Sequence, residues 1–293
     1  MNKGVVSVLV AYLIWGLYPF YFHAMQHVAP TEIVIHRVLW TFALLAVYLF
    51  WIQKAITDRR AVAVFLMSSV LITANWSTYT YAIVTNQTLE ASLGYFMNPL
   101  VSVLLGTVFL KEKLNKAQML AIVFACAGVM WVTFKQGEFP ALGLTLALSF
   151  GFYGLVRKMA PLGSLEGLTL ETAFAFPVAL LATFYFAGNG DLTFVHGTSW
   201  DKFWLIMAGP ITTIPLILFA YGLKQVPYST VGFIQYLSPT MVFFIGLFFF
   251  GEELQVDRLI GFILIWTGVL IFVGENFFRS HSGYRTEFNQ LSK

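Results

Sequence analysis

Long runs of apolar residues without charge recur along the chain, and they limit its fold more than any other feature. A helix that crosses the hydrocarbon core of a bilayer needs about 20 such residues, whereas membrane-spanning strands show segments of about ten residues with alternating polarity. The runs are continuous, so we expect an all-α polytopic membrane protein with ten transmembrane helices. These are expected near residues 4–23, 33–53, 61–84, 88–110, 116–134, 140–157, 167–187, 203–223, 228–250 and 257–277.

The composition agrees with lipid as the main solvent. The 293 residues are 58% hydrophobic and 11% charged, whereas soluble domains carry about 25% charged residues. The first apolar run, Val5–Phe22, exceeds the usual core of a signal peptide and ends without a small-x-small cleavage pattern, so we interpret it as a retained helix. The lone Cys126 excludes a disulfide within the chain and a cysteine-rich metal site.

The basic residues predict the orientation. If the N-terminus is inside, only Arg37, Lys135, Lys202 and Arg258, four of the 17 Lys and Arg residues, fall on the outer side. Basic residues concentrate in cytoplasmic loops. We therefore expect both termini in the cytoplasm.

The chain contains an internal repeat. With a shift of 140 residues, segment 64–134 aligns without a gap on 204–274. The matched pairs include Tyr81/Tyr221, Pro99/Pro239, Gly106/Gly246, Glu112/Glu252, Leu114/Leu254 and Gly128/Gly268. We expect a first five-helix repeat over 1–137, a second over 138–278 and a cytoplasmic tail over 279–293.

Five helices per repeat place the second copy upside down relative to the first. Inverted repeats build many secondary transporters, with the substrate site near the middle of the bilayer. The pattern favours a secondary transporter that moves small amphipathic metabolites or drugs by alternating access. The alternative is a membrane-embedded enzyme or a scaffold without transport activity.

The paired Pro–Gly–Glu–Leu strings resemble the drug/metabolite transporter superfamily, in its EamA type. The opening Ala11–Gly16, the stretch Glu32–Trp40 and the stretch Leu93–Pro99 are similar to its RarD branch, the chloramphenicol-sensitive proteins. The resemblance covers essentially the whole chain. It implies a bacterial inner-membrane permease that acts as an exporter, and it names no substrate.

Two charged residues inside apolar helices are candidates for the substrate site. Arg37 lies in the second expected helix, and Glu171 occupies the mirrored place in the other half. An ionisable group within a membrane segment is costly and marks a functional site by default. One hypothesis is a carboxylate–guanidinium pair between them. The alternatives are an Arg37 that extends to the interface and a structural role.

Mirrored polar pairs point to a central cavity. Tyr95 and Asn98 share a helix face in one half, and Gln235 and Ser238 share one in the other. A proline follows each pair directly and frees a backbone carbonyl. The alternative role for these residues is hydrogen bonding between helices.

Aromatic and amide groups supply further candidates for substrate contact, because aromatic walls bind apolar or planar solutes. These candidates are Trp15, Tyr18, Asn75, Trp76 and Tyr79. We interpret Glu112 and Glu252 as caps of the helices that follow them. No P-loop, zinc-protease or nucleophile-elbow motif occurs. We therefore predict no catalytic residue, cofactor or metal, and as partners a small-molecule substrate and lipid but no nucleic acid; the sequence leaves open whether the protein is a monomer or a dimer.

Overall fold

The structure, a computed structural model, describes residues 2–50, 58–84, 88–137, 139–251 and 256–291, and the described part is helical throughout its regular elements. The first half contains α1 (Lys3–Gly16), α2 (Tyr18–Ala24), α3 (Pro30–Leu45), the 3-10 helix η1 (Ala46–Phe50), α5 (Arg59–Val84), α6 (Thr88–Phe109) and α7 (Lys116–Gln136). The second half contains α8 (Ala141–Met159), α9 (Ser164–Asn189), the short α10 (Thr193–His196), α11 (Ser199–Leu223), α12 (Tyr228–Gln235), α13 (Leu237–Phe249) and α14 (Val256–Leu291).

The expectation of an all-helical membrane protein with ten spanning segments is confirmed. Among the described residues, eight helical segments are long and apolar enough to cross a membrane, and Leu93–Phe109 forms a shorter apolar helix. The 19-residue helix α8 completes the set. Large apolar side chains such as Leu181 and Phe248 expose about 70% of their surface. Such exposed apolar side chains are scattered over the outer helices. This distribution is the one expected for a surface that contacts lipid.

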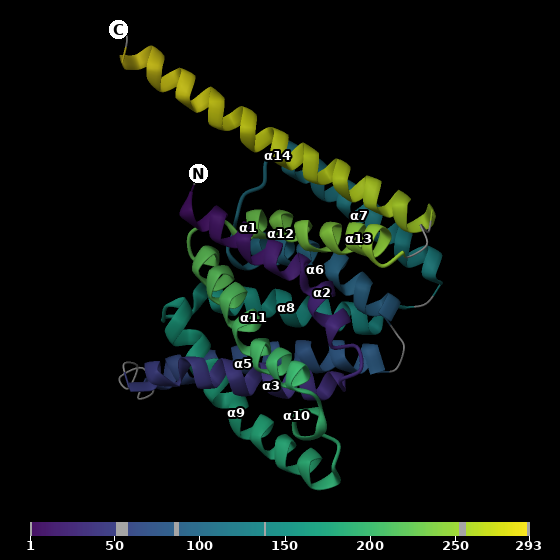
Figure 1. The fold of residues 1–293 in the computed structure, drawn as a ribbon. Coiled ribbons are helices and arrows are strands. Elements are labelled where there is room, and N and C mark those ends of the chain that lie inside the picture. The colour runs from purple at the N-terminus through teal and green to yellow at the C-terminus, as the bar shows by residue number, and fades with distance from the viewer. Residues whose placement is uncertain (1, 51–57, 85–87, 138, 252–255, 292–293) are drawn as a thin grey trace.

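Helix packing follows the two inverted halves. The first and sixth spanning segments take equivalent places: α1 packs against α11 and α13, and α8 packs against α5 and α6. Three helix pairs, namely α3 with α9, α6 with α12 and α7 with α14, join equivalent members of the two halves. In Figure 1, α7 and α14 lie together at one edge and α9 lies at the opposite edge. α1 begins and α14 ends at the same end of the bundle (Figure 1).

The pairing of α7 with α14 depends on glycine. A Cβ atom on Gly268 of α14 would lie 2.5 Å from the backbone oxygen of Ala121 in α7, and one on Gly128 would lie 2.7 Å from the backbone oxygen of Gly261. Glycine therefore lets the two backbones approach closely, as small residues do in membrane helix pairs.

Several helix boundaries differ from the prediction. The first and ninth expected helices are each divided, at Leu17 and at Tyr236. The second expected helix begins earlier, at Pro30, and continues past Leu45 as the 3-10 helix η1. The last helix was expected to end near residue 277 but continues to Leu291, so most of the expected tail is helical. Periodicity alone cannot locate such ends, because caps and prolines set them.

Candidate functional site

Two broken helices lie at the centre of the molecule. α1 ends at Gly16 and α2 begins at Tyr18, with Pro19 in the first turn of α2. Proline lacks the amide hydrogen and its ring obstructs the preceding turn, so the helix cannot continue unchanged. α12 and α13 are likewise separated at Tyr236, shortly before Pro239. By contrast, α6 continues through Pro99, so the two mirrored prolines have different effects.

A cavity of about 430 Å³ lies beside these breaks and is lined from both halves of the chain. Ten of the eleven predicted site residues line it: Trp15, Tyr18, Arg37, Asn75, Trp76, Tyr79, Tyr95, Asn98, Gln235 and Ser238. Glu171, the eleventh, is not among the lining residues. The structure thus brings most of the predicted residues together. Whether they bind substrate stays a prediction.

Arg37 carries positive charge into the cavity from α3. Its Nε donates a hydrogen bond to Oγ1 of Thr212 at 2.9 Å, and its guanidinium carbon lies 4.3 Å from the centre of the Trp76 ring. No carboxylate in the described part of the chain forms an ion pair with it. The aromatic face supports the planar cation, while the terminal nitrogens remain for another partner.

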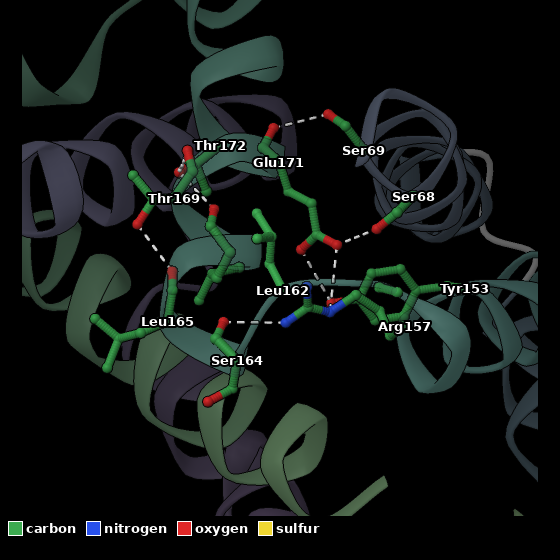
Figure 2. Close-up of polar contacts among 12 residues, drawn as sticks. Ser68, Ser69, Tyr153, Arg157, Leu162, Ser164, Leu165, Thr169, Glu171 and Thr172 are labelled. Atoms are coloured by element: carbon green, nitrogen blue, oxygen red, sulfur yellow. Dashed lines mark hydrogen bonds and ion pairs between the residues drawn. The ribbon is translucent and has the colours of Figure 1, made fainter. Parts of the chain in front are cut away.

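Glu171 does not pair with Arg37, so the hypothesis of a pair between the halves is wrong. Figure 2 shows Glu171 beside Arg157, with Oε1 of the carboxylate 3.4 Å from Nε of the guanidinium. Ser68 donates to the same carboxylate oxygen, and Tyr153 donates to Oε2 at 3.3 Å. Both charged side chains are almost fully buried. The mirrored position of Glu171 therefore does not make it a partner of Arg37, because Arg157 at the end of α8 compensates its charge first.

Polar groups of the cavity are only partly satisfied. Ser102 donates to Oε1 of Gln235 at 2.9 Å, but Nε2 of Gln235 and Oδ1 of Asn98 are buried and form no hydrogen bond with any described residue. Asn75 instead donates to the backbone oxygen of Leu146 and to Oγ of Ser149, both at 3.0 Å. A buried polar group without a partner costs free energy. Asn98 and Gln235 can recover this cost by binding a solute, whereas Asn75 mainly joins α5 to α8.

Aromatic rings form much of the remaining wall. Trp15 packs edge-on against Phe150 at 5.9 Å, and Tyr79 packs edge-on against Tyr95 at 6.0 Å between ring centres. Tyr18 donates to the backbone oxygen of Ile211 at 2.8 Å. These contacts fix the rings as flat surfaces for an apolar body.

Several other residues that line the cavity were not predicted from the sequence. They include Tyr12, Phe150, Phe243, Arg258 and Phe262. Arg258 had a usable signal, since it is a basic residue at the start of an apolar helix on the side where basic residues are rare. The phenylalanines had none, because 17% of the chain is aromatic.

Charged side chains close the bundle at the end where the termini lie. Lys158 donates to the backbone oxygens of Leu223 and Val226, at 2.7 and 2.5 Å, and Lys224 returns the contact to Ala160 at 2.9 Å and to Leu162. These bonds satisfy carbonyls at the ends of α8 and α11. The two helices are thus tied to each other, beyond the end of the cavity.

Glu112 also acts at this end, but not as predicted. Its Oε1 accepts from the amide of Tyr228 at 2.6 Å, and its Oε2 accepts from the amide of Ser229 at 2.8 Å. It therefore caps α12 of the other half. The helix after it, α7, is capped by Asn115 and Gln118. Glu252 lies outside the described residues.

The spanning helices, the inverted halves and the central cavity define a multi-pass membrane protein of the transporter kind. The model of the EamA-like transporter family matches the chain twice, over residues 2–134 and 140–274. The chain belongs to the EamA-like transporter family, in its RarD-like group, and is a membrane transporter.

Relatives in bacteria agree with this assignment. An uncharacterized transporter of Pseudomonas aeruginosa is 38% identical over 93% of each chain. Protein RarD of Escherichia coli is 36% identical over 93% of this chain and 94% of its own. The chloramphenicol-sensitive protein RarD of Pseudomonas aeruginosa is 27% identical, over 92% of this chain and 93% of its own. A solved crystal structure of a protein with 15% identity shares the fold, with a TM-score of 0.68 over 92% of this chain and 96% of its own.

Proposed function

We propose that this protein is a secondary transporter that exports small amphipathic molecules across the bacterial inner membrane by alternating access. The cavity between the two halves is the observation that carries the proposal. Its volume falls within the range of about 300–1,000 Å³ found for small-molecule sites. Its wall combines aromatic rings with a few polar groups, which suits a solute that has an apolar body and a polar end.

The ten predicted residues that line the cavity are the proposed binding residues. Asn98 and Gln235 have the strongest support after Arg37, because each keeps a buried polar atom without a partner. Asn98→Ala and Gln235→Ala should each weaken substrate binding by about 1–3 kcal/mol, if a hydrogen bond to a buried group is lost. Unchanged affinity in both folded variants would assign these residues to helix packing.

Alternating access is supported by the unequal ends of the bundle. At the end of the termini, Glu112 of the first half holds α12 of the second, and Lys158 and Lys224 tie α8 to α11 within the second half. The cavity instead extends to Phe22 near the end of α2 and to Arg258 near the start of α14, toward the opposite end. This arrangement corresponds to a state closed on the terminal side. Export then requires these links to open and the far side to close.

We also propose that both termini are cytoplasmic and that the repeats occupy 1–137 and 138–278, with 279–293 beyond the second. The excess of Lys and Arg on the terminal side supports this orientation. Single cysteines introduced on a Cys126→Ser background, followed by labelling of intact cells, test it. Labelling of a cysteine beside Arg59 from outside would contradict it.

Transport itself is tested with the purified full chain in liposomes. The vesicles are loaded with a metabolite library, with and without a pH gradient, and the external medium is analysed by mass spectrometry. We expect export of a small set of amphipathic solutes that vesicles loaded in the same way but lacking the protein do not release. A protein that is folded and inserted but moves no solute in either condition would overturn the proposal.

A further inference from the structure

We propose that the transported solutes are organic anions, with the anionic group bound at Arg37 and the apolar body held between the aromatic walls. This inference rests on the proposed function and gives its substrate class. Among the described residues that line it, only Arg37 and Arg258 are charged, and both are cationic.

Two described carboxylates that could neutralise Arg37, those of Glu32 and Glu171, are engaged elsewhere. Glu32, one helical turn before it in α3, accepts from the backbone amides of Thr193 and Phe194 at 3.0 and 2.7 Å. Glu171 is held by Arg157. The cation of Arg37 is therefore left without a counter-charge by the part of the chain that the structure describes.

Arg258 likewise has no counter-charge among the described residues. The neighbouring Asp257 lies 3.3 Å from Lys135, and no ion pair to Arg258 is formed among the described residues. Two guanidinium groups that have no counter-charge among the described residues thus border one cavity inside a membrane protein. Such charge is costly at this depth, and binding an anion would relieve the cost. A bound cation would increase it.

The geometry at Arg37 suits a carboxylate or a group of similar shape. Trp76 covers the face of the guanidinium, and Thr212 takes only its Nε. The edge with the two terminal nitrogens is free of protein partners in the described chain. A guanidinium edge binds carboxylate and phosphate groups in a bidentate manner, with two parallel hydrogen bonds.

Tyrosines surround the same point. The hydroxyls of Tyr18, Tyr79 and Tyr95 lie within electrostatic range of Arg37. Those of Tyr79 and Tyr95 form no hydrogen bond within the described chain, and Tyr95 exposes half of its surface. A phenolic hydroxyl can donate to an anion, so Tyr79 and Tyr95 add donors beside the guanidinium, whereas the hydroxyl of Tyr18 already donates to Ile211. Cavity carboxylates that could hold an ammonium group are absent from the described lining.

Binding by isothermal titration calorimetry on the purified full chain tests the proposal. The probes are two matched sets: phenylacetate, phenylacetamide and phenethylamine, and indole-3-acetate, indole-3-acetamide and tryptamine. Within each set the ring is constant and the end group is anionic, neutral or cationic. We expect at least one anion to bind, about tenfold or more tighter than its amide and its amine.

Substitutions connect this preference to the residue. Arg37→Gln should raise the Kd of the anion about tenfold or more, because the charge-assisted hydrogen bonds are lost, and should leave the Kd of the amide nearly unchanged. Arg37→Lys keeps the charge without the planar edge and should fall between. Lys3→Gln removes an exposed positive charge far from the cavity and is the matched control. Circular dichroism and gel filtration establish that the variants are folded.

Three outcomes would overturn the inference: amides or amines that bind as tightly as the anions, no binding by any anion, or an Arg37→Gln variant that binds anions like the wild type. Its failure is distinct from failure of the proposed function. Liposomes that export neutral or cationic solutes regardless of Arg37→Gln refute the substrate class and retain the transporter. Liposomes that export nothing refute the transporter.

Discussion

Arg37 and Arg157 both lie within apolar helices, and their charges are compensated in opposite ways. Arg157 is 1% exposed and lies against Glu171, with a backbone carbonyl at Ser164 and the ring of Phe65 completing its surroundings. Arg37 has a hydroxyl and an aromatic face as partners and borders an open cavity. The described part of the chain supplies a counter-charge for Arg157 and none for Arg37.

The difference indicates that Arg157 stabilises the fold, whereas Arg37 serves the function. A buried ion pair is sensitive to removal of one partner, because the other charge is then left uncompensated. A cation beside a cavity retains some solvation and depends less on its neighbours. Stability measurements should therefore separate the two arginines clearly.

The largest effect is expected for Glu171→Ala. It leaves the buried Arg157 unpaired and should lower the free energy of unfolding by about 3–5 kcal/mol. Chemical unfolding in detergent micelles, followed by circular dichroism, measures this. Glu166→Ala, which removes a less buried carboxylate from the same helix, is the control. The double variant Arg157→Met/Glu171→Met should recover most of the loss, and a double variant as unstable as the single one would contradict this account.

Gly167→Ala should have the next largest effect. A Cβ atom there would lie 1.8 Å from Nη1 of Arg157, so the ion pair has to move. Overpacking of this kind costs about 1–3 kcal/mol. Gly188→Ala in the same helix is the control, since nothing lies within 4 Å of its added Cβ. Equal unfolding curves for the two variants would mean that Arg157 is not confined as described.

Trp76→Leu should have a smaller effect. It removes the ring beneath Arg37 and should cost about 0.5–2 kcal/mol through the lost cation–π contact, in addition to lost packing. Trp131→Leu is the control, because Lys135 lies 5.0 Å from the centre of the Trp131 ring and neither residue is among those that line the cavity. Thermal unfolding of both, with and without a bound probe, gives the comparison. Only Trp76→Leu should also change the stabilisation by the probe.

The smallest change in stability is expected for Arg37→Gln, below about 1 kcal/mol, because removal of a costly charge offsets the lost contacts with Trp76 and Thr212. Its effect should fall on transport instead. Arg157→Gln in the same assay should unfold far more easily, since it leaves Glu171 buried without its counter-charge. If the Arg37 variant is the less stable of the two, the separation between a structural and a functional arginine is wrong.

Much of the fold could be predicted from the sequence, because apolar runs of bilayer length and the 140-residue repeat are strong, simple patterns. The same repeat also led to one wrong prediction, the pair between Arg37 and Glu171. It matched Arg37 with Glu171 by position, whereas electrostatics matched Glu171 with Arg157, which the turn after α8 brings close. Symmetry of sequence thus predicts equivalent positions but not which charges meet.

The site was predictable where a residue type is rare in its surroundings. Arg37 and Asn98 are polar interruptions of apolar helices, and both line the cavity. Phe150 and Phe243 line it too but cannot be distinguished by sequence from rings that face lipid. The target of Glu112 was beyond sequence reasoning as well, because a cap can serve any helix start that lies nearby in space.

The bond between Glu112 and α12 has a consequence for synthesis of the protein. Its two partners lie 116 and 117 residues further along the chain. Translation proceeds at about 5–20 residues per second. Roughly 6 to 23 s therefore pass between synthesis of Glu112 and synthesis of the two residues whose amides it binds. Until then water has to solvate Glu112 at the membrane surface. A nascent chain released before residue 228 therefore lacks the amides that bind Glu112. Quality-control proteases can recognise the first half by this unpaired carboxylate.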